Sequence, residues 1–329
     1  MLDAISILMI STEWPTKDRP NAVPFLVRDV GLLRKYNVIV DVFHFRGGKN
    51  PFNYLKATIK LSKKLRGSNY NLIHAQWGQS AIPVFFSKLP LVTTFRGSDL
   101  FGITNINGRH TVIGNILKFV SRIVAIRSNY VVLVSDRMVP IVSKKKKLAI
   151  LPSGINLSLF SPGSMEEARE RLNIDSTMKI VLFGGDPNRT DKRFFLARDA
   201  IKILESTLPV QLLVANNIEQ DKMPEYYRAA DVLLLTSKHE GSPNMVKEAL
   251  ACNLPVVSVD VGDVKERING LPNCYICEND RPEVIANTIK LTLESKKEAY
   301  PYRNHVLDLD EHLLIQKQID IYKTVLRKV

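Results

Sequence analysis

Two glutamates, Glu240 and Glu248, stand eight positions apart around a predicted junction between a turn and a helix. The first lies in the turn, and the second lies about two helical turns further on. Gly241, Ser242 and a capping Asn244 would open this helix, so its backbone N–H groups could bind a phosphate or sugar hydroxyls. The two carboxylates could accept hydrogen bonds from sugar or ribose hydroxyls. By pattern alone, a solvated helix face explains Glu248 better.

A second cluster combines a glycine with cations. Gly185 follows a predicted strand, and Arg189, Lys192 and Arg193 come next, before a predicted helix. A diphosphate leaving group gains negative charge as its bond breaks, so fixed cations would stabilise the transition state more than the ground state. Basic residues at a helix start are often only solvated, and the pattern alone favours that simpler interpretation.

Polar residues also follow two predicted strands in the first half of the chain. Arg96 and Asp99 lie directly after the run 91–94, and His74 lies at the end of the run 72–75. Arginine stays charged, so Arg96 cannot act as a general base, although it could neutralise charge or bind a hydroxyl. Asp99 fits a loop-stabilising role as well as a catalytic one. A single histidine at a strand end is more often structural than a ligand contact.

The run 239–266, HEGSPNMVKEALACNLPVVSVDVGDVKE, resembles the donor-binding signature of the family-4 glycosyltransferases. That signature has two glutamates separated by seven residues, a helix of small residues, Pro-Val-Val, and a glycine-containing turn that ends in glutamate, here Gly262 and Glu266. The resemblance implies a retaining, metal-independent sugar transfer from a UDP- or GDP-linked donor, with no cofactor. It also implies the GT-B fold, in which two Rossmann-like α/β domains have parallel sheets and a C-terminal helix crosses back to the first domain.

The same resemblance assigns roles to the second cluster and to the glutamates. Glu240 corresponds to the residue that contacts the transferred sugar, and Glu248 to the one that holds the ribose. Lys192 corresponds to the phosphate-binding lysine, although it lies seven residues after Gly185 where the family has six. Asp186 stands where the family has an arginine, so Arg189 is the predicted replacement, with Arg193 as the alternative.

In the first half, the segment 93–100 (TTFRGSDL) resembles the family's His-Gly-x-Asp segment, with Arg96 at the histidine position. The retaining mechanism ascribed to the family needs no protein base there, because the departing phosphate takes the acceptor proton. We therefore predict a site without metal ligands, and we assign its residues to three groups. The catalytic residues are Arg96, Lys192 and Glu240; the donor-binding residues are Gly185, Arg189, Lys192, Glu240, Gly241, Ser242, Asn244 and Glu248; the acceptor-binding residues are His74 and Asp99.

Short apolar runs alternate along the chain with amphipathic stretches of helix length, which predicts mostly parallel sheets covered by helices. The predicted strands are 5–10, 38–43, 72–75, 91–94, 130–134, 149–151, 179–183, 210–215, 232–236 and 256–259, and the predicted helices are 24–35, 54–66, 194–205, 225–230 and 244–252. Turn-forming residues collect at 152–163. We therefore predict an acceptor-binding domain over 1–160, a donor-binding domain over 161–309, and a helix over 310–329 that packs on the first domain.

The formal net charge of the 329 residues is +13, and it is unevenly distributed. Residues 1–150 hold 23 Lys and Arg against 7 Asp and Glu, whereas residues 151–329 hold 23 against 26. A basic first half attracts a phosphorylated acceptor, an anionic membrane or nucleic acid. On the predicted helix, Lys56, Lys60, Lys63 and Lys64 share one face, which is either solvated or docks on anionic lipid. No nucleic-acid-binding pattern is present, so we expect no nucleic-acid partner.

Three cysteines, Cys252, Cys274 and Cys277, fit a reducing compartment, and one Cys-x-x-Cys pair without a second pair does not predict zinc. The run 4–10 resembles a buried first strand more than a signal peptide, and 112–134, the longest apolar stretch, is interrupted by basic residues. These features predict a cytoplasmic protein, free or peripheral on the inner face of the membrane.

Together these observations predict a glycosyltransferase of the hexosyltransferase type that acts on a saccharide or lipid-linked saccharide in cell-surface polysaccharide synthesis. Two other classes stay open at this point. The first is a catalytically silent sugar- or nucleotide-binding module, which the arginine at position 96 favours. The second is a basic nucleic-acid-binding protein.

Overall fold

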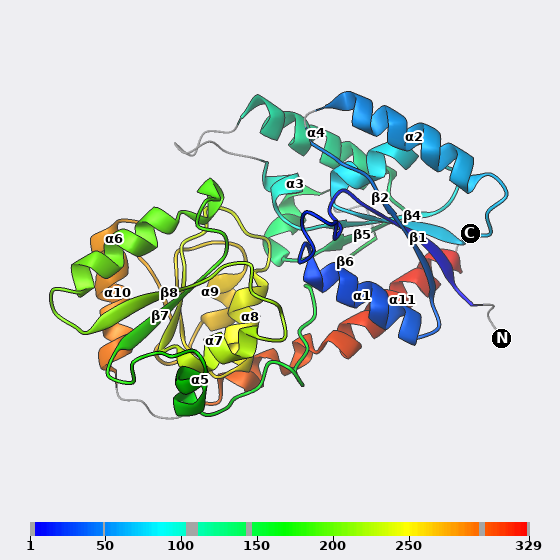
Figure 1. Ribbon diagram of the computed structural model, residues 1–329. Helices are drawn as coiled ribbons and strands as arrows, with labels where there is room; N and C mark the ends of the chain where they lie inside the picture. Colours follow the sequence, from blue (N-terminus) through cyan, green and yellow to red (C-terminus); the bar gives the residue numbers. More distant parts are fainter. Residues whose placement is uncertain (1–3, 49, 103–110, 143–146, 296–299, 328–329) are drawn as a thin grey trace. The chain divides into compact units, whose positions relative to one another are not determined.

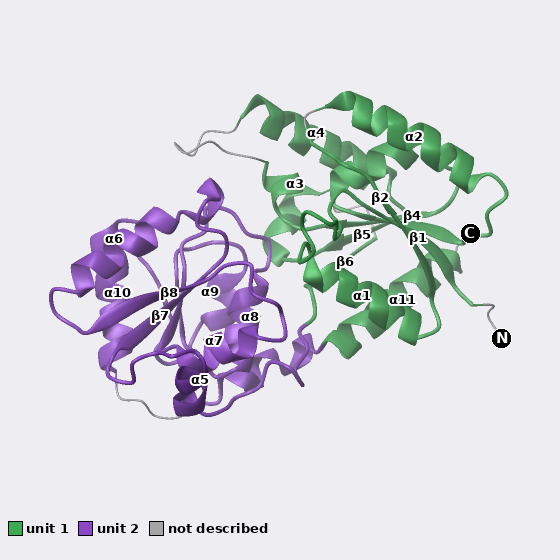
Figure 2. Ribbon diagram, in the orientation of Figure 1, with its two compact units in different colours: residues 1–154, 311–329 green, residues 155–310 purple. Residues whose placement is uncertain are grey.

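The computed structural model describes residues 4–48, 50–102, 111–142, 147–295 and 300–327. The chain forms two compact units (Figure 2). Unit 1 consists of residues 1–154 and 311–329, and unit 2 of residues 155–310. The chain therefore enters unit 2 at Ile155, slightly before the expected boundary at 160.

Unit 1 contains a six-stranded parallel sheet with the strand order β2-β1-β3-β4-β5-β6. Every residue of β3 and β4 is buried, as expected for parallel strands that are covered on both faces. Its strands are β1 (Ser6–Ser11), β2 (Ile39–His44), β3 (Leu72–Gln76), β4 (Leu91–Phe95), β5 (Tyr130–Leu133) and β6 (Leu148–Ile150). The apolar runs in the sequence predicted these strands, and the α/β fold class is confirmed.

Helices cover both faces of this sheet (Figure 1). One face carries α1 (Pro24–Lys35) and α11 (Glu311–Leu326), which pack against each other. The elements of the other face are α2 (Pro51–Leu65), η1 (Gly78–Val84), α3 (Ser98–Phe101) and α4 (Val112–Arg127). A short turn of helix, η2 (Asp136–Ile141), follows β5. The two outer helices, α2 and α4, both pack on η1.

The C-terminal helix α11 packs on unit 1, which confirms the prediction from the sequence (Figure 2). Arg28 on α1 lies with its Nε 2.5 Å from Glu311 Oε2, and its Nη2 donates to the Gly154 carbonyl oxygen at 2.7 Å. A Cβ atom at Gly154 would lie 2.5 Å from the Glu311 Cα. Only glycine allows the start of α11 to approach the end of the first segment this closely.

Unit 2 contains a five-stranded parallel sheet with the strand order β11-β10-β9-β7-β8. Its strands are β7 (Lys179–Gly184), β8 (Val210–Ala215), β9 (Val232–Leu235), β10 (Val256–Ser258) and β11 (Tyr275–Ile276). Its helices are α5 (Met165–Arg171), η3 (Thr190–Lys192), α6 (Phe194–Leu204), α7 (Met223–Ala229), α8 (Asn244–Ala251), α9 (Val264–Ile268), α10 (Pro282–Glu294) and η4 (Tyr302–Leu309). Because β7 and β9 are neighbours, the loops at their carboxyl ends meet at one edge of the sheet.

Candidate functional site

The closest contact between two predicted site residues joins Lys192 to Glu240. Lys192 Nζ lies 2.6 Å from Glu240 Oε1, and each side chain is 18% exposed. Lys192 belongs to the loop after β7, and Glu240 to the loop after the neighbouring strand β9. Gly185 has a φ of +129°, and a Cβ there would lie 3.5 Å from the Lys192 side chain. The lysine stem thus packs along the glycine, and its ammonium group points at the carboxylate.

Hydrogen bonds hold these two loops together. Thr236 Oγ1 donates to the Lys192 carbonyl oxygen at 2.8 Å, and Arg193 Nε donates to the Thr236 carbonyl oxygen at 2.7 Å. The backbone N–H of Lys238 donates to the Asp191 carbonyl oxygen at 2.8 Å. These hydrogen bonds therefore fix the distance between the two predicted catalytic residues of this unit.

Arg189 and Arg193, the two candidates to replace the arginine that the family has at position 186, have different surroundings. Arg189 is exposed, and its Nη2 lies 2.6 Å from Asp191 Oδ2. The hydrogen bond to Asp191 raises the pKa of Arg189, and the charge of Glu240 acts in the same direction. Arg193 has a φ of +50°, and its Nη1 lies 2.5 Å from Asp280 Oδ2. Arg193 therefore holds the loop, whereas Arg189 adds positive charge near Glu240.

The start of α8 differs from the prediction in one respect. Pro243, not Asn244, is the N-cap residue, and no side chain caps the helix, so the predicted capping role of Asn244 is wrong. Asn244 Oδ1 is buried and has no hydrogen-bond partner. Ser242 Oγ donates to Asp263 Oδ2 at 2.8 Å. The segment before α8 thus offers an acceptor oxygen that the protein leaves unsatisfied, which is costly unless a ligand or water donates to it.

The turn after β10 supports the loop that carries Glu240. A Cβ at Gly262 would lie 2.8 Å from the Gly241 carbonyl oxygen, and the φ of Gly262 is +56°. Both facts require glycine at this position, because a side chain would push the two loops apart. Glu266, at the end of the family-like run, is exposed on α9.

Glu248 is buried, so the interpretation of this position as a solvated helix face is wrong. It is 7% exposed, and the neighbouring Lys247 is fully buried. Tyr227 Oη on α7 donates to Glu248 Oε2 at 2.8 Å. Burial, and then the charge of Glu248, raise the pKa of the Tyr227 hydroxyl well above its usual value, so it stays a donor. The hydrogen bond from Tyr227 thus gives the Glu248 carboxylate a fixed orientation.

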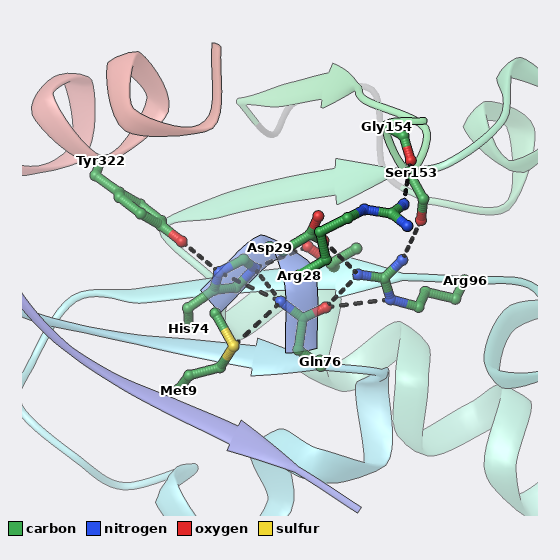
Figure 3. Close-up of polar contacts among 10 residues, drawn as sticks. Met9, Arg28, Asp29, His74, Gln76, Arg96, Ser153, Gly154 and Tyr322 are labelled. Atoms are coloured by element: carbon green, nitrogen blue, oxygen red, sulfur yellow. Dashed lines mark hydrogen bonds and ion pairs between the residues drawn. The ribbon is translucent and has the colours of Figure 1, made fainter. Parts of the chain in front are cut away.

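In unit 1, Arg96 follows β4 and is held from several sides (Figure 3). Its Nε and Nη2 donate to Gln76 Oε1 at 3.1 and 2.7 Å, and its Nη1 donates to Ser153 Oγ at 2.8 Å. The guanidinium carbon lies 4.5 Å from the ring centre of Phe25 and 5.6 Å from that of Trp77. Burial lowers the pKa of Arg96. These contacts fix the guanidinium group in place.

Asp99 organises the loop that carries Arg96. Its carboxylate is almost fully buried and accepts hydrogen bonds from the backbone N–H groups of Arg96, Gly97, Leu100 and, across the loop, Gly78. Burial raises the pKa of this carboxyl group above its usual value, and the hydrogen bonds from the backbone N–H groups offset only part of that rise. These contacts are those of a residue that shapes the backbone around Arg96.

His74, the other predicted acceptor contact, has both ring nitrogens occupied (Figure 3). Nδ1 lies 2.7 Å from Tyr322 Oη on α11, and Nε2 lies 2.8 Å from Thr94 Oγ1. Burial, and then the charge of Arg96, lower the pKa of His74 to about 3, so the ring is neutral. His74, Gln76 and Arg96 line a cavity of about 30 Å³, room for roughly two water molecules.

The neutral His74 makes stability depend on pH. An unfolded chain binds a proton at this ring below pH 6.5, and the folded protein does not until about pH 3, so stability falls as the pH drops through this interval. Between pH 7 and pH 5 we expect His74 to account for a loss of about 2 kcal/mol in the free energy of unfolding. Urea titrations of the parent and of His74→Gln at both pH values measure this difference. Equal pH dependence in the two proteins would contradict the assignment.

The comparisons with known proteins support the resemblance seen in the sequence. Residues 164–295, most of unit 2, match the family described as Glycosyl transferases group 1. Unit 2 of this chain therefore contains a region that matches the group 1 glycosyltransferases. TuaC of Bacillus subtilis, which its name assigns to teichuronic acid biosynthesis, is 28% identical over 65% of this chain and 59% of its own length. The chain spans about half the length of the curated relatives that it matches.

Solved structures of other proteins show the same fold. Sucrose-phosphate synthase of Thermosynechococcus elongatus matches 98% of this chain and 99% of its own with a TM-score of 0.79 at 15% identity. Alr3699/HepE of Anabaena, solved in complex with UDP-glucose, matches 97% of this chain and 99% of its own with a TM-score of 0.68 at 16% identity. The predicted GT-B fold is confirmed.

Three residues that support the candidate site residues in the two units were not predicted from the sequence. Tyr227 orients Glu248, Thr236 ties the Lys192 loop to β9, and Gln76 holds Arg96. Each acts on a side chain or loop far away in the sequence, so its own local pattern carries no signal. Only the position of Thr236 and Gln76 at or just after strand ends marked them as candidates.

The remaining sequence predictions concern metals, cysteines and membranes. Within the described ranges, no group of three or more His, Cys, Asp or Glu side chains is arranged to hold a metal ion. Burial raises the pKa of Cys252 and Cys274 to about 12, so these free thiols stay protonated. No helix within the same ranges is long and apolar enough to cross a membrane.

Proposed function

We propose that this chain is a retaining glycosyltransferase that moves a sugar from a nucleotide-diphosphate donor to a saccharide or lipid-linked saccharide acceptor. The observation that carries the proposal is the Lys192–Glu240 pair, held at 2.6 Å at the carboxyl edge of the second sheet. The family assignment and the likeness to TuaC support sugar transfer in cell-surface polysaccharide synthesis. The UDP-glucose complex of HepE supports a nucleotide-sugar donor on this fold.

In this proposal the bond between the sugar C1 and the β-phosphate oxygen breaks, and a bond between C1 and the acceptor oxygen forms on the same face. The acceptor proton passes to the departing phosphate, so no protein base is required. Lys192, with Arg189 nearby, stabilises the negative charge that grows on the phosphate. Glu240 fixes the ammonium group of Lys192 and accepts a hydrogen bond from a sugar hydroxyl.

The other predicted residues bind the donor or shape the site. Glu248, held by Tyr227, accepts from the ribose hydroxyls, and Asn244 Oδ1 accepts from a ligand donor. Gly241 and Ser242 contribute backbone groups. In unit 1, Arg96 supplies a fixed positive charge to the sugar or acceptor, and His74 and Asp99 act through the network and loop that hold it.

Hydrolysis and transfer assays of the purified chain with a panel of UDP- and GDP-sugars test this function. We expect slow release of one nucleotide diphosphate, retention of configuration in any transfer product, and no change in rate with EDTA, because the lysine and arginine replace a metal ion. Tight donor binding without any turnover would favour the silent binding module. Loss of turnover on chelation would contradict the metal-independent mechanism.

A further inference from the structure

Helix α4 buries small side chains and exposes large apolar ones, which is the reverse of the usual arrangement in a surface helix. It buries Gly114, Ser121, Val124 and Ala125 against unit 1, so small residues dominate its inner face. Its outer face exposes a stripe of large apolar side chains, between 37% and 76% exposed, at alternating spacings of four and three: Val112, Ile116, Phe119, Ile123 and Ile126. Such a contiguous apolar stripe is costly in water and marks an interaction surface.

The neighbouring elements extend this stripe into a surface. Helix α2 exposes Phe52, Leu55 and Ile59 by 65%, 57% and 51%, and α2 and α4 lie on the same side of unit 1, both packed on η1 (Figure 1). Phe86, in the loop after η1, is 95% exposed. Arg127 at the end of α4 donates to the carbonyl oxygens on either side of Phe86 and so holds this ring beside α4. We call these nine side chains the apolar face of unit 1.

The charge around the apolar face has a single sign. Residues 42–135 contain 13 Lys and Arg and one acidic residue, Asp99, which is buried. Exposed Lys56, Lys60 and Lys63 on α2 and Arg122 on α4 lie among the exposed apolar residues. Lys64, grouped with these lysines in the sequence, pairs instead with Asp41 at 2.6 Å. Of the basic run 144–147, only Lys147 lies within the described residues.

We propose that the apolar face of unit 1 docks on the surface of an anionic lipid bilayer. An interfacial helix combines apolar residues that enter the acyl boundary with basic residues that meet the phosphate groups, and α2 and α4 both have this composition. A second copy of the chain, joined through the same face, would bring the basic residues of both copies together at a cost. The charge therefore favours lipid as the occupant.

Binding of the full-length chain to vesicles tests this proposal without donor or acceptor, so its outcome is independent of the proposed function. We expect binding to vesicles that contain phosphatidylglycerol, little binding to pure phosphatidylcholine, and weaker binding at high salt. The variant Ile116→Ser with Phe119→Ser should bind at least about tenfold more weakly, because two apolar side chains no longer enter the bilayer. Lys60→Gln with Lys63→Gln should also weaken binding, by about fivefold for each residue.

A matched control removes two exposed apolar residues from unit 2, Phe195→Ser with Leu291→Ser, whose side chains are 51% and 58% exposed in the parent. This control should bind as the parent does, and all variants should keep the parental unfolding transition because the changed residues are exposed. Absence of vesicle binding at low salt would overturn the proposal. Equal binding by the Ile116 and Phe119 variant would overturn it too, as would self-association of the chain that this variant abolishes.

Discussion

Replacement of Lys192 with glutamine is expected to lower kcat of donor hydrolysis by a factor of about 10² to 10³, while KM for the donor changes much less. The ammonium group is fixed before the reaction by Glu240 and by the packing along Gly185, so it gains its full effect only as charge develops on the phosphate. Loss of one such preorganised charge contact costs roughly 3–4 kcal/mol in the transition state. Initial rates over a range of donor concentrations separate the two constants.

Two neighbouring arginines provide the controls. Arg189→Gln removes an exposed cation whose charge is already shared with Asp191, so kcat should fall by no more than about tenfold. Arg193→Gln removes a loop contact to Thr236 and should reduce stability as well as activity. If Arg189→Gln abolished turnover and Lys192→Gln did not, the main phosphate contact would belong to Arg189 and not to Lys192.

Glu240→Gln distinguishes the two roles given to this carboxylate. If Glu240 acts mainly by fixing Lys192, the double variant with Lys192→Gln should be little worse than the lysine variant alone. If it acts mainly through the sugar, the two losses should add. Either result supports a site at this pair, whereas full activity in both single variants would contradict the assignment of a site to Lys192 and Glu240.

The sequence located the Lys192–Glu240 pair for a physical reason. Each residue follows a strand that is recognisable as an apolar run, and a parallel sheet brings the loops after neighbouring strands to one edge. The resemblance to the family predicted the roles of Lys192 and Glu240, and the strand order explains why the two residues lie close together. The contact of Glu248 with Tyr227 had no comparable signal, because the pattern of an amphipathic helix does not say which helix it packs against.

Helix α4 shows where sequence patterns are least informative. Its sequence stands out only as the longest apolar stretch, because Ile116 and Phe119 on its outer face remove the alternation of polar and apolar positions that predicts a surface helix. The same exposed apolar side chains that hide the helical pattern in the sequence also form the proposed membrane surface. A helix that is apolar on its outer face contradicts the rules for a solvated element, and such contradictions are expected at sites of function.

Asp231→Ala is expected to destabilise unit 2 by about 3–5 kcal/mol, the typical cost of removing one partner from a buried ion pair. Asp231 Oδ2 lies 2.7 Å from Arg169 Nη2 and accepts from the Ile180 backbone N–H at 2.7 Å, and the two side chains are 2% and 9% exposed. The pair ties α5 to the start of β7, the strand that leads to Lys192. Thermal unfolding of a unit of this size should shift by roughly 6–20 °C.

A matched control lies on the same helix. Glu167 pairs with Arg171 at 3.2 Å, but both side chains are more than half exposed, so Glu167→Ala should change the free energy of unfolding by less than about 1 kcal/mol. The double variant Asp231→Leu with Arg169→Met should recover much of the loss, because no charge is then left buried without a partner. If Asp231→Ala unfolded at the same urea concentration as the control, the ion pair would not hold α5 against the sheet, and the position of the Lys192 loop would have to depend on its contacts to β9 alone.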